Sequence, residues 1–336
     1  MEPAVVSGGR RLRVGLVSFA HVHAPGLLRT LALLPQVDLS GLYDEEGRGG
    51  DAVRAAGSTA HPTLDALLER SEAVVIASTN VDHRRYTEAA AARGVHVLSE
   101  KPLATTLEDA RAMVAACEAA GVRLGTAFPV RSSAAVLSLK DLIGRGALGT
   151  VRAIRGANPG RYPGGWFGDR TQAGGGAVLD HTVHVADLVR WLLADEFTRV
   201  QAELGSWLWG LEVEDCGVIS ADLAGGAFVS IDCSWSRPRT YPTWGGLTLH
   251  VVGERGTVDV DVFRQSLTHH DDRAGETRLV GWGDDLNAGL VGGFADAILA
   301  GREVPVTGAD GLRALEVAIA AYRSAEAGRP VAIAGL

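Results

Sequence analysis

The sequence predicts an α/β protein with an N-terminal Rossmann-type parallel-sheet domain and a C-terminal α+β domain with a mostly antiparallel, open sheet. Three observations predict this fold class. The chain has 336 residues, a length that favours two domains over one. In its first third, short apolar runs alternate with helical patterns, as right-handed crossovers between parallel strands require. Farther along, strand-like runs follow one another with turns between them, which is typical of antiparallel sheets.

The first domain is expected to comprise residues 1–128, with residues 1–10 as a flexible tail. Apolar runs predict its strands at residues 12–17, 37–43, 73–77, 95–98 and 122–127. The run at 73–77 is wholly apolar, as in a strand that helices cover on both faces. Helices are expected between the strands, at residues 25–34, 64–69, 80–93 and 106–120.

Three of these helices begin with recognisable start signals. Pro25 suits the first position of a helix, because its fixed φ and missing N–H cost nothing there. Asn80 is predicted to cap the helix that runs to residue 93. The sequence from Thr106 to Asp109 resembles a capping box.

The second domain is expected to comprise residues 129–336. A helix is predicted from about residue 180 to 193, and two more close the chain at 286–299 and 309–327. Strands are predicted between them at residues 199–204, 217–223, 227–235, 247–252 and 257–262.

Composition excludes several classes of partner and site. The 32 basic and 40 acidic residues give a formal charge of −8, which is unfavourable for binding a nucleic-acid backbone. No uncharged apolar run reaches the roughly 18 residues of a membrane span, and the acidic start is unlike a secretory signal. Three cysteines without a C-x-x-C spacing argue against disulfides or a zinc knuckle, so we expect a cytoplasmic protein.

The loop after the first strand only partly matches a dinucleotide-binding loop. Rossmann loops use glycines so that the backbone can approach the pyrophosphate. Here Ser18 and Ala20 take the two tight positions, and His23 takes the third. Both substitutes are small, so close approach remains feasible, but an ordinary strand-to-helix turn explains the segment equally well.

The second strand ends in three consecutive acidic residues, Asp44, Glu45 and Glu46. A carboxylate at this position typically accepts hydrogen bonds from the adenosine ribose. Three acids would also repel a 2′-phosphate, which favours NAD over NADP. A solvated acidic turn is the alternative.

Lys101 is one of only two lysines, with Lys140, among the 32 basic residues. Because the chain uses Arg wherever positive charge suffices, a retained Lys suggests a need for its compact, tunable amine. It follows Glu100 and precedes Pro102 at the carboxyl end of a predicted parallel strand, the edge where such sheets bind ligands. A surface turn with a Glu–Lys pair is the alternative.

Asp180 and His184 are four residues apart in a helical pattern that three glycines precede. That spacing puts them on one helix face, and a neighbouring carboxylate raises the proton affinity of an imidazole. The pair therefore suits a general base. Alternatively, Asp180 caps the helix or His184 is structural. No metal is expected here, because neighbouring ligands from one helix seldom complete a site.

Taken together, these motifs resemble the glucose–fructose oxidoreductase / inositol dehydrogenase / rhizopine-catabolism (Gfo/Idh/MocA) family. The resemblance rests on Glu100-Lys101-Pro102 with Gly174-Gly175-Gly176-x-x-x-Asp180-x-x-x-His184. It also includes Ala77-Ser78-Thr79-Asn80-x-x-His83, the run at residues 141–149 and the ending at 306–312, and so extends over nearly the whole chain.

The resemblance implies a bound NAD and hydride transfer between nicotinamide and a secondary hydroxyl or ketone of a sugar, polyol or related compound. Lys101 would bind the reacting hydroxyl, His184 would exchange its proton, and Asp180 would orient both. The implied cofactor-binding residues are Ser18, Phe19, Ala20, His21, Asp44, Ser78, Thr79, Asn80, His83, Glu100 and Lys101. Less secure matches place Arg131, Trp166 and His181 at the substrate.

The family also implies a homodimer or homotetramer that forms through the C-terminal sheet. Two other functions remain open. One is a redox-neutral enzyme that uses tightly bound NAD for transient oxidation and elimination. The other is a ligand-sensing protein with a dehydrogenase fold and no catalytic activity.

Overall fold

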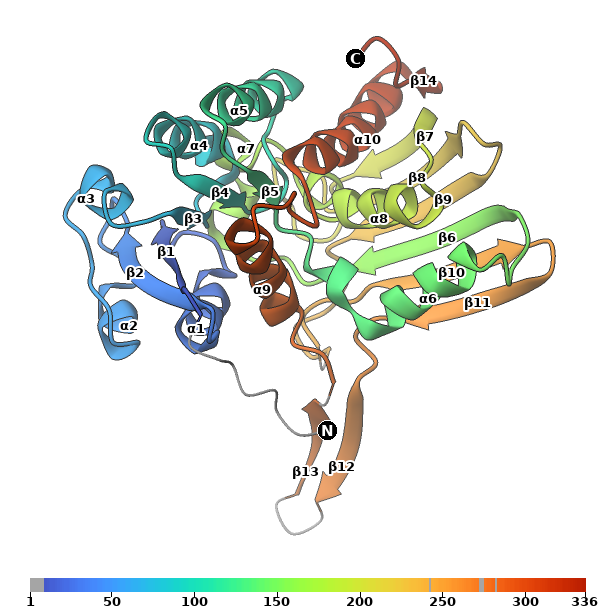
Figure 1. Ribbon diagram of the computed structural model, residues 1–336. Helices are drawn as coiled ribbons and strands as arrows, with labels where there is room; N and C mark the ends of the chain where they lie inside the picture. Colours follow the sequence, from blue (N-terminus) through green and yellow to red (C-terminus); the bar gives the residue numbers. More distant parts are fainter. Residues whose placement is uncertain (1–8, 242, 272–274, 282) are drawn as a thin grey trace. The chain divides into compact units, whose positions relative to one another are not determined.

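The computed structural model describes residues 9–241, 243–271, 275–281 and 283–336 (Figure 1). Its described residues form two compact units. The first consists of Met1–Phe128 and Asn287–Leu312, and the second of Pro129–Leu286 and Arg313–Leu336. The predicted tail, residues 1–10, lies outside the described residues except for its last two positions.

The first unit contains the predicted parallel sheet. Its strands are β1 (Leu12–Val17), β2 (Val37–Tyr43), β3 (Ala73–Ile76), β4 (His96–Ser99) and β5 (Leu124–Thr126). They lie in the order β2-β1-β3-β4-β5, and every pair is parallel. Strand order reverses between β1 and β3, so the loops at their carboxyl ends diverge at the point where open α/β sheets bind ligands.

The helices of this unit follow the predicted alternation. They are α1 (Ala24–Leu33), α2 (Gly50–Ala55), α3 (Leu64–Leu68), α4 (His83–Ala92), α5 (Leu107–Ala120) and α9 (Leu286–Leu299). Thr106 caps α5 as predicted, since its side chain accepts a hydrogen bond from the Asp109 amide. The predicted Asn80 cap is wrong: residues Asn80–Asp82 form a 3₁₀ turn, η1, and α4 begins after Asp82.

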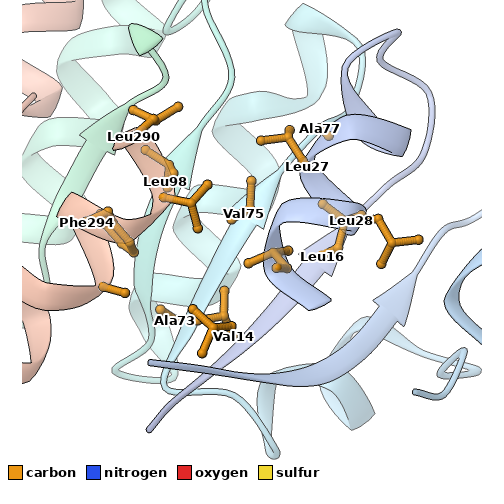
Figure 2. Close-up of a cluster of buried hydrophobic side chains, with 14 of the residues drawn as sticks. Val14, Leu16, Leu27, Leu28, Ala73, Val75, Ala77, Leu98, Leu290 and Phe294 are labelled. Atoms are coloured by element: carbon orange, nitrogen blue, oxygen red, sulfur yellow. The ribbon is translucent and has the colours of Figure 1, made fainter. Parts of the chain in front are cut away.

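Helix α9 has the predicted bounds but completes the core of the first unit. Leu290 and Phe294 pack with Leu98 and Val75 of the sheet, while Leu27 of α1 belongs to the same apolar cluster (Figure 2). A backbone hydrogen bond also connects this segment to the sheet, because the Thr126 amide of β5 donates to the carbonyl of Val306. The segment Asn287–Leu312 therefore belongs to the Rossmann unit, although it is far from the other residues of that unit in sequence.

The second unit is built on a mostly antiparallel sheet, as predicted. Seven strands lie in the order β11-β10-β6-β9-β8-β7-β14, and only β6 and β9 pair in parallel. They are β6 (Val151–Pro159), β7 (Phe197–Gly205), β8 (Cys216–Leu223), β9 (Phe228–Ser234), β10 (Thr248–Gly253), β11 (Gly256–Asp261) and β14 (Val331–Ala332). A separate hairpin joins β12 (Ser266–Asp271) and β13 (Glu276–Gly281). These two strands, like β6 and β14, were not predicted.

One helix of the second unit carries two of the predicted catalytic residues, Asp180 and His184. Helix α8 (Ala177–Leu193) packs against β6, β8 and β9, and begins three residues before the predicted start at 180. Gly156 permits this packing, because a Cβ there would lie 2.4 Å from Val185 of the helix. The other helices are η2 (Pro129–Ser132), α6 (Ala134–Gly144), η3 (Gly165–Gly168), α7 (Arg170–Ala173) and α10 (Gly308–Ala327). Among the described residues, no helix is long and apolar enough to cross a membrane.

Candidate active site

The loop after β1 adopts a backbone that glycine would normally supply. Ser18 has φ +67°, in the left-handed region that non-glycine residues rarely occupy. Its hydroxyl donates to Asp44 Oδ1 at 3.1 Å and accepts from the Ala20 amide at 3.3 Å. The serine side chain thereby stabilises a turn in which Rossmann loops usually have a glycine.

Asp44 is the centre of a compact hydrogen-bond network at the end of β2. Its carboxylate accepts from the amide of Phe19 at 2.8 Å and from the guanidinium of Arg48, whose Nε is 3.0 Å from Oδ2. Burial disfavours the charged form, but the Arg48 hydrogen bond, helped by backbone amides, lowers the pKa of Asp44. The structure thus holds an ionised carboxylate directly against the loop after β1, where the sequence predicts the adenosine ribose.

The histidines of the loop approach Glu100, which follows β4. His23 Nδ1 lies 3.0 Å from Glu100 Oε1, and His21 Nδ1 lies 3.9 Å from the same oxygen. The His23 amide donates to His21 Nδ1 at 3.1 Å. Burial of Glu100 opposes ionisation, yet the neighbouring His21 and His23 hold the pKa of this carboxyl well below its usual range.

Lys101 is buried beside this carboxylate. The residue is only 2% exposed, and its amide donates to Glu100 Oε2 at 3.1 Å. His83 is fully buried in α4. Its Nδ1 lies 3.0 Å from the carbonyl oxygen of Pro102 and 3.3 Å from that of Leu103, the two residues that follow Lys101. Because carbonyls only accept, this nitrogen donates, and burial lowers the pKa of the ring. His83 therefore stabilises the turn that carries Lys101.

The turn after β3 is also largely buried. Ser78, Thr79 and Asn80 are each at most 9% exposed. The Thr79 hydroxyl donates to Asp82 at 2.7 Å, which fixes the start of η1. The structure thus brings all the predicted cofactor-binding residues to the carboxyl edge of one sheet in the first unit.

In the second unit, two of the three glycines before α8 accommodate a close approach of other chain segments. A Cβ on Gly175 would lie 2.1 Å from the Tyr322 hydroxyl, and one on Gly176 would lie 1.9 Å from the carbonyl oxygen of Glu214. Glu214 Oε1 accepts from the amides of Gly176 and Val178 at 2.8 and 3.0 Å. The Tyr322 hydroxyl donates to the same oxygen at 2.6 Å. These contacts fix the first turn of α8.

Asp180 lies in that first turn, buried among polar partners. Its Oδ2 accepts from Trp235 Nε1 at 3.2 Å and lies 3.2 Å from His181 Nε2. His181 Nδ1 faces the carbonyl of Asn158 at 2.5 Å, so that nitrogen is a donor. Asp180 is therefore held in place by Trp235, which directly follows β9, and by its neighbour His181 on the same helix. His184 follows one turn later on α8 and is half-buried.

The other predicted substrate residues have structural partners. Arg131 forms a buried bidentate ion pair with Asp187 of α8, at 2.8 Å from Nε to Oδ2 and 2.5 Å from NH2 to Oδ1. Trp166 stacks on Phe167 with a centroid distance of 3.9 Å. Their roles at a substrate stay predictions.

The residues that support these positions were not predicted from the sequence. Trp235 and Tyr322 lie far along the chain from the residues that they support, Asp180 and Glu214. Glu214 has no sequence pattern that would link it to the three glycines. Only Arg48, four residues after Asp44, had a spacing that indicates an ion pair.

Each of the two units contains a segment that matches a known protein family. Residues 12–128 match the family model described as "Oxidoreductase family, NAD-binding Rossmann fold", and residues 136–259 match the "GFO/IDH/MocA C-terminal domain". Over 151 residues the chain is 44% identical to the 1,5-anhydro-D-fructose reductase of Ensifer adhaerens, which covers 44% of this chain and 45% of that protein.

Two other relatives cover almost the whole chain. Glucose-6-phosphate 3-dehydrogenase of Bacillus subtilis is 26% identical over 90% of this chain and 93% of its own. The solved structure of GenD2 from gentamicin A biosynthesis, in complex with NAD, has a TM-score of 0.88, 28% identity and 99% coverage of both chains. The predicted resemblance is thus confirmed, and the chain belongs to the Gfo/Idh/MocA family of oxidoreductases with an NAD-binding Rossmann domain.

Proposed function

We propose that the protein is an NAD-dependent oxidoreductase that moves a hydride between nicotinamide and a secondary hydroxyl or ketone of a sugar, polyol or related compound. One observation carries the proposal: a buried lysine stands at the carboxyl edge of an NAD-binding Rossmann sheet. The named relatives support the substrate class, because they are a reductase and a dehydrogenase of sugar derivatives.

The residues at the sheet edge fit a dinucleotide. Ser18 already has the backbone conformation of the glycine it replaces, and Ala20 is small enough for the pyrophosphate to approach. Asp44 would accept hydrogen bonds from the hydroxyl groups of the adenosine ribose. Together with Glu45 and Glu46, it favours NAD over NADP, which carries an additional negatively charged phosphate. The loops after β1, β3 and β4 would hold the rest of the cofactor, which supplies the hydride acceptor when bound.

The proton chemistry is assigned to three side chains. In the oxidation direction, His184 would accept the proton of the hydroxyl group, and the carbon that bears this hydroxyl would lose a hydride to the bound nicotinamide. The Lys101 ammonium stabilises the negative charge that develops on the oxygen. Asp180, held by Trp235, orients His184 and the substrate. In the reverse direction, His184 returns the proton to the oxygen.

The test is turnover of a substrate panel with added NAD. We expect sugars, polyols or their keto forms to cause interconversion of oxidised and reduced nicotinamide, followed by its absorbance. Product formation without net cofactor consumption would instead indicate the redox-neutral alternative. Failure of NAD to bind at millimolar concentration in calorimetry would refute the proposal as a whole.

Asp44→Ala is expected to weaken NAD binding by about tenfold or more, since hydrogen bonds to charged groups contribute roughly 1.5–3 kcal/mol. The substitution removes both the proposed ribose acceptor and the partner of the Phe19 amide. Calorimetric titration with NAD measures the change. The matched control is Asp51→Ala, because Asp51 is fully exposed in α2 and pairs only with a surface arginine. Equal affinities in the two variants would exclude Asp44 from the cofactor site.

The quaternary structure and location complete the proposal. Helices α6 and α8 lie on one side of the seven-stranded sheet, whereas Val218 of β8 and Phe228 of β9 are exposed (Figure 1). We propose that copies of the chain associate through this sheet into a homodimer or homotetramer. The three cysteines are free thiols, in keeping with the proposed cytoplasmic location.

A further inference from the structure

His21, His23 and Glu100 form a cluster at the predicted cofactor-binding edge of the sheet, and the proposed hydride and proton transfer assigns no step to any of them. Each residue offers one ligand atom, and these atoms all lie within 4.8 Å of one another. Within the part of the chain that the structure describes, no other group of three or more His, Cys, Asp or Glu side chains meets this condition. We propose that these three residues form a binding site for one divalent transition-metal ion of the zinc class.

The donor set suits such an ion. Imidazole nitrogen and carboxylate oxygen are both ligands of Zn²⁺ and of its spectroscopic substitute Co²⁺, and two histidines with one glutamate are an established zinc ligand combination. A carboxylate ligand such as Glu100 would also bring a negative charge to the ion. Calcium and magnesium are disfavoured, because they prefer all-oxygen sites.

Both histidine nitrogens lie near the distance from the carboxylate oxygen that ligands of one ion have. Tetrahedral ligands at about 2.0–2.1 Å from zinc are about 3.3 Å apart. Here Glu100 Oε1 lies 3.0 Å from His23 Nδ1 and 3.9 Å from His21 Nδ1, on either side of that value. Binding would replace the proton on His23 Nδ1, and would release His21 Nδ1 from the His23 amide.

Surrounding contacts fix the carboxylate, and one of the two histidines is partly exposed. Glu100 Oε2 accepts from the Lys101 amide at 3.1 Å, which holds the carboxylate in the manner of the outer hydrogen bonds that orient metal ligands. His21 is buried, but the side chain of His23 is 34% exposed. Because zinc sites usually have four ligands, three protein ligands leave one coordination position for water or another oxygen ligand.

The test is titration of the nucleotide-free, full-length protein with Co²⁺, followed by visible absorption and by displacement with Zn²⁺. We expect one Co²⁺ per chain in the wild type. His23→Ala and Glu100→Gln should each weaken binding by at least about 10–100-fold. These two positions are preferred over His21, whose substitution removes a fully buried ring from the loop.

His250→Ala is the matched control. His250 also pairs with a carboxylate, Asp259 at 2.7 Å, but no third ligand joins that pair among the described residues, so wild-type affinity is expected. The proposal is overturned if the wild type binds no Co²⁺, or if both cluster variants bind it as tightly as the wild type. Calorimetric titration of the same preparations with NAD separates this failure from failure of the proposed function.

Discussion

Lys101→Ala is expected to lower turnover by about 10²-fold or more, the scale of lost acid–base and charge-stabilising catalysis. Lys101 is buried beside the ionised carboxylate of Glu100, at the sheet edge where the cofactor is proposed to bind. Since the ammonium is assigned to charge that develops during the reaction, kcat should fall more than KM rises. Steady-state kinetics on a substrate found in the panel measures both constants.

Lys140→Ala is the matched control for this variant, because Lys140 is the only other lysine. Its ammonium donates to the carbonyl oxygens of Trp191 and Leu192 at the end of α8, so it has a structural role. We expect turnover within about twofold of the wild type. Lys101→Arg should stay impaired, since a planar guanidinium cannot take the place of a compact ammonium in a buried position. Wild-type rates in Lys101→Ala would eliminate the proposed mechanism.

The Rossmann unit was predictable because its signals are local. Each strand is a short apolar run, and start signals such as Thr106 act within one turn of their helix. Asn80 shows the limit of such signals. It is a good cap by residue type, but η1 extends the turn by three residues, and the helix starts after Asp82 instead.

Elements that depend on distant partners were not predictable in the same way. β6 contains two arginines and a glycine, so its apolar alternation is weak, although it is a central strand of the second sheet. Its glycine is explained only by Val185, which approaches from α8. Helix α9 was found with its bounds, but the sequence does not indicate that its Phe294 completes the core of the first unit.

The candidate site likewise contains residues that were predictable from the sequence and residues that were not. The residue types that carry chemistry, such as Lys101 and Asp180, stand in recognisable motifs. Their supports do not, because Trp235 is 55 residues away from Asp180, and Tyr322 is 108 residues away from Glu214. Hydrogen bonds over such separations are set by the packing of α8 and α10 with the sheet, which no local pattern encodes.

Asp187→Ala is expected to destabilise the second unit by about 3–5 kcal/mol, because it leaves the buried guanidinium of Arg131 without its counter-charge. The Asp187 side chain is wholly buried and that of Arg131 is 8% exposed, so water cannot replace the lost partner. The pair also joins η2 to α8, the helix that carries Asp180 and His184. Chemical denaturation followed by circular dichroism measures the change in the free energy of unfolding.

A surface pair of similar geometry separates the effect of burial from that of the ion pair itself. Arg199 also bonds to Asp222 through two guanidinium nitrogens, but both side chains are substantially exposed. Asp222→Ala should therefore cost no more than about 1 kcal/mol. In addition, the double variant Arg131→Met/Asp187→Leu should be more stable than Asp187→Ala, since it removes the unpaired charge along with its partner. If Asp187→Ala and Asp222→Ala cost the same, the buried ion pair does not stabilise the position of α8.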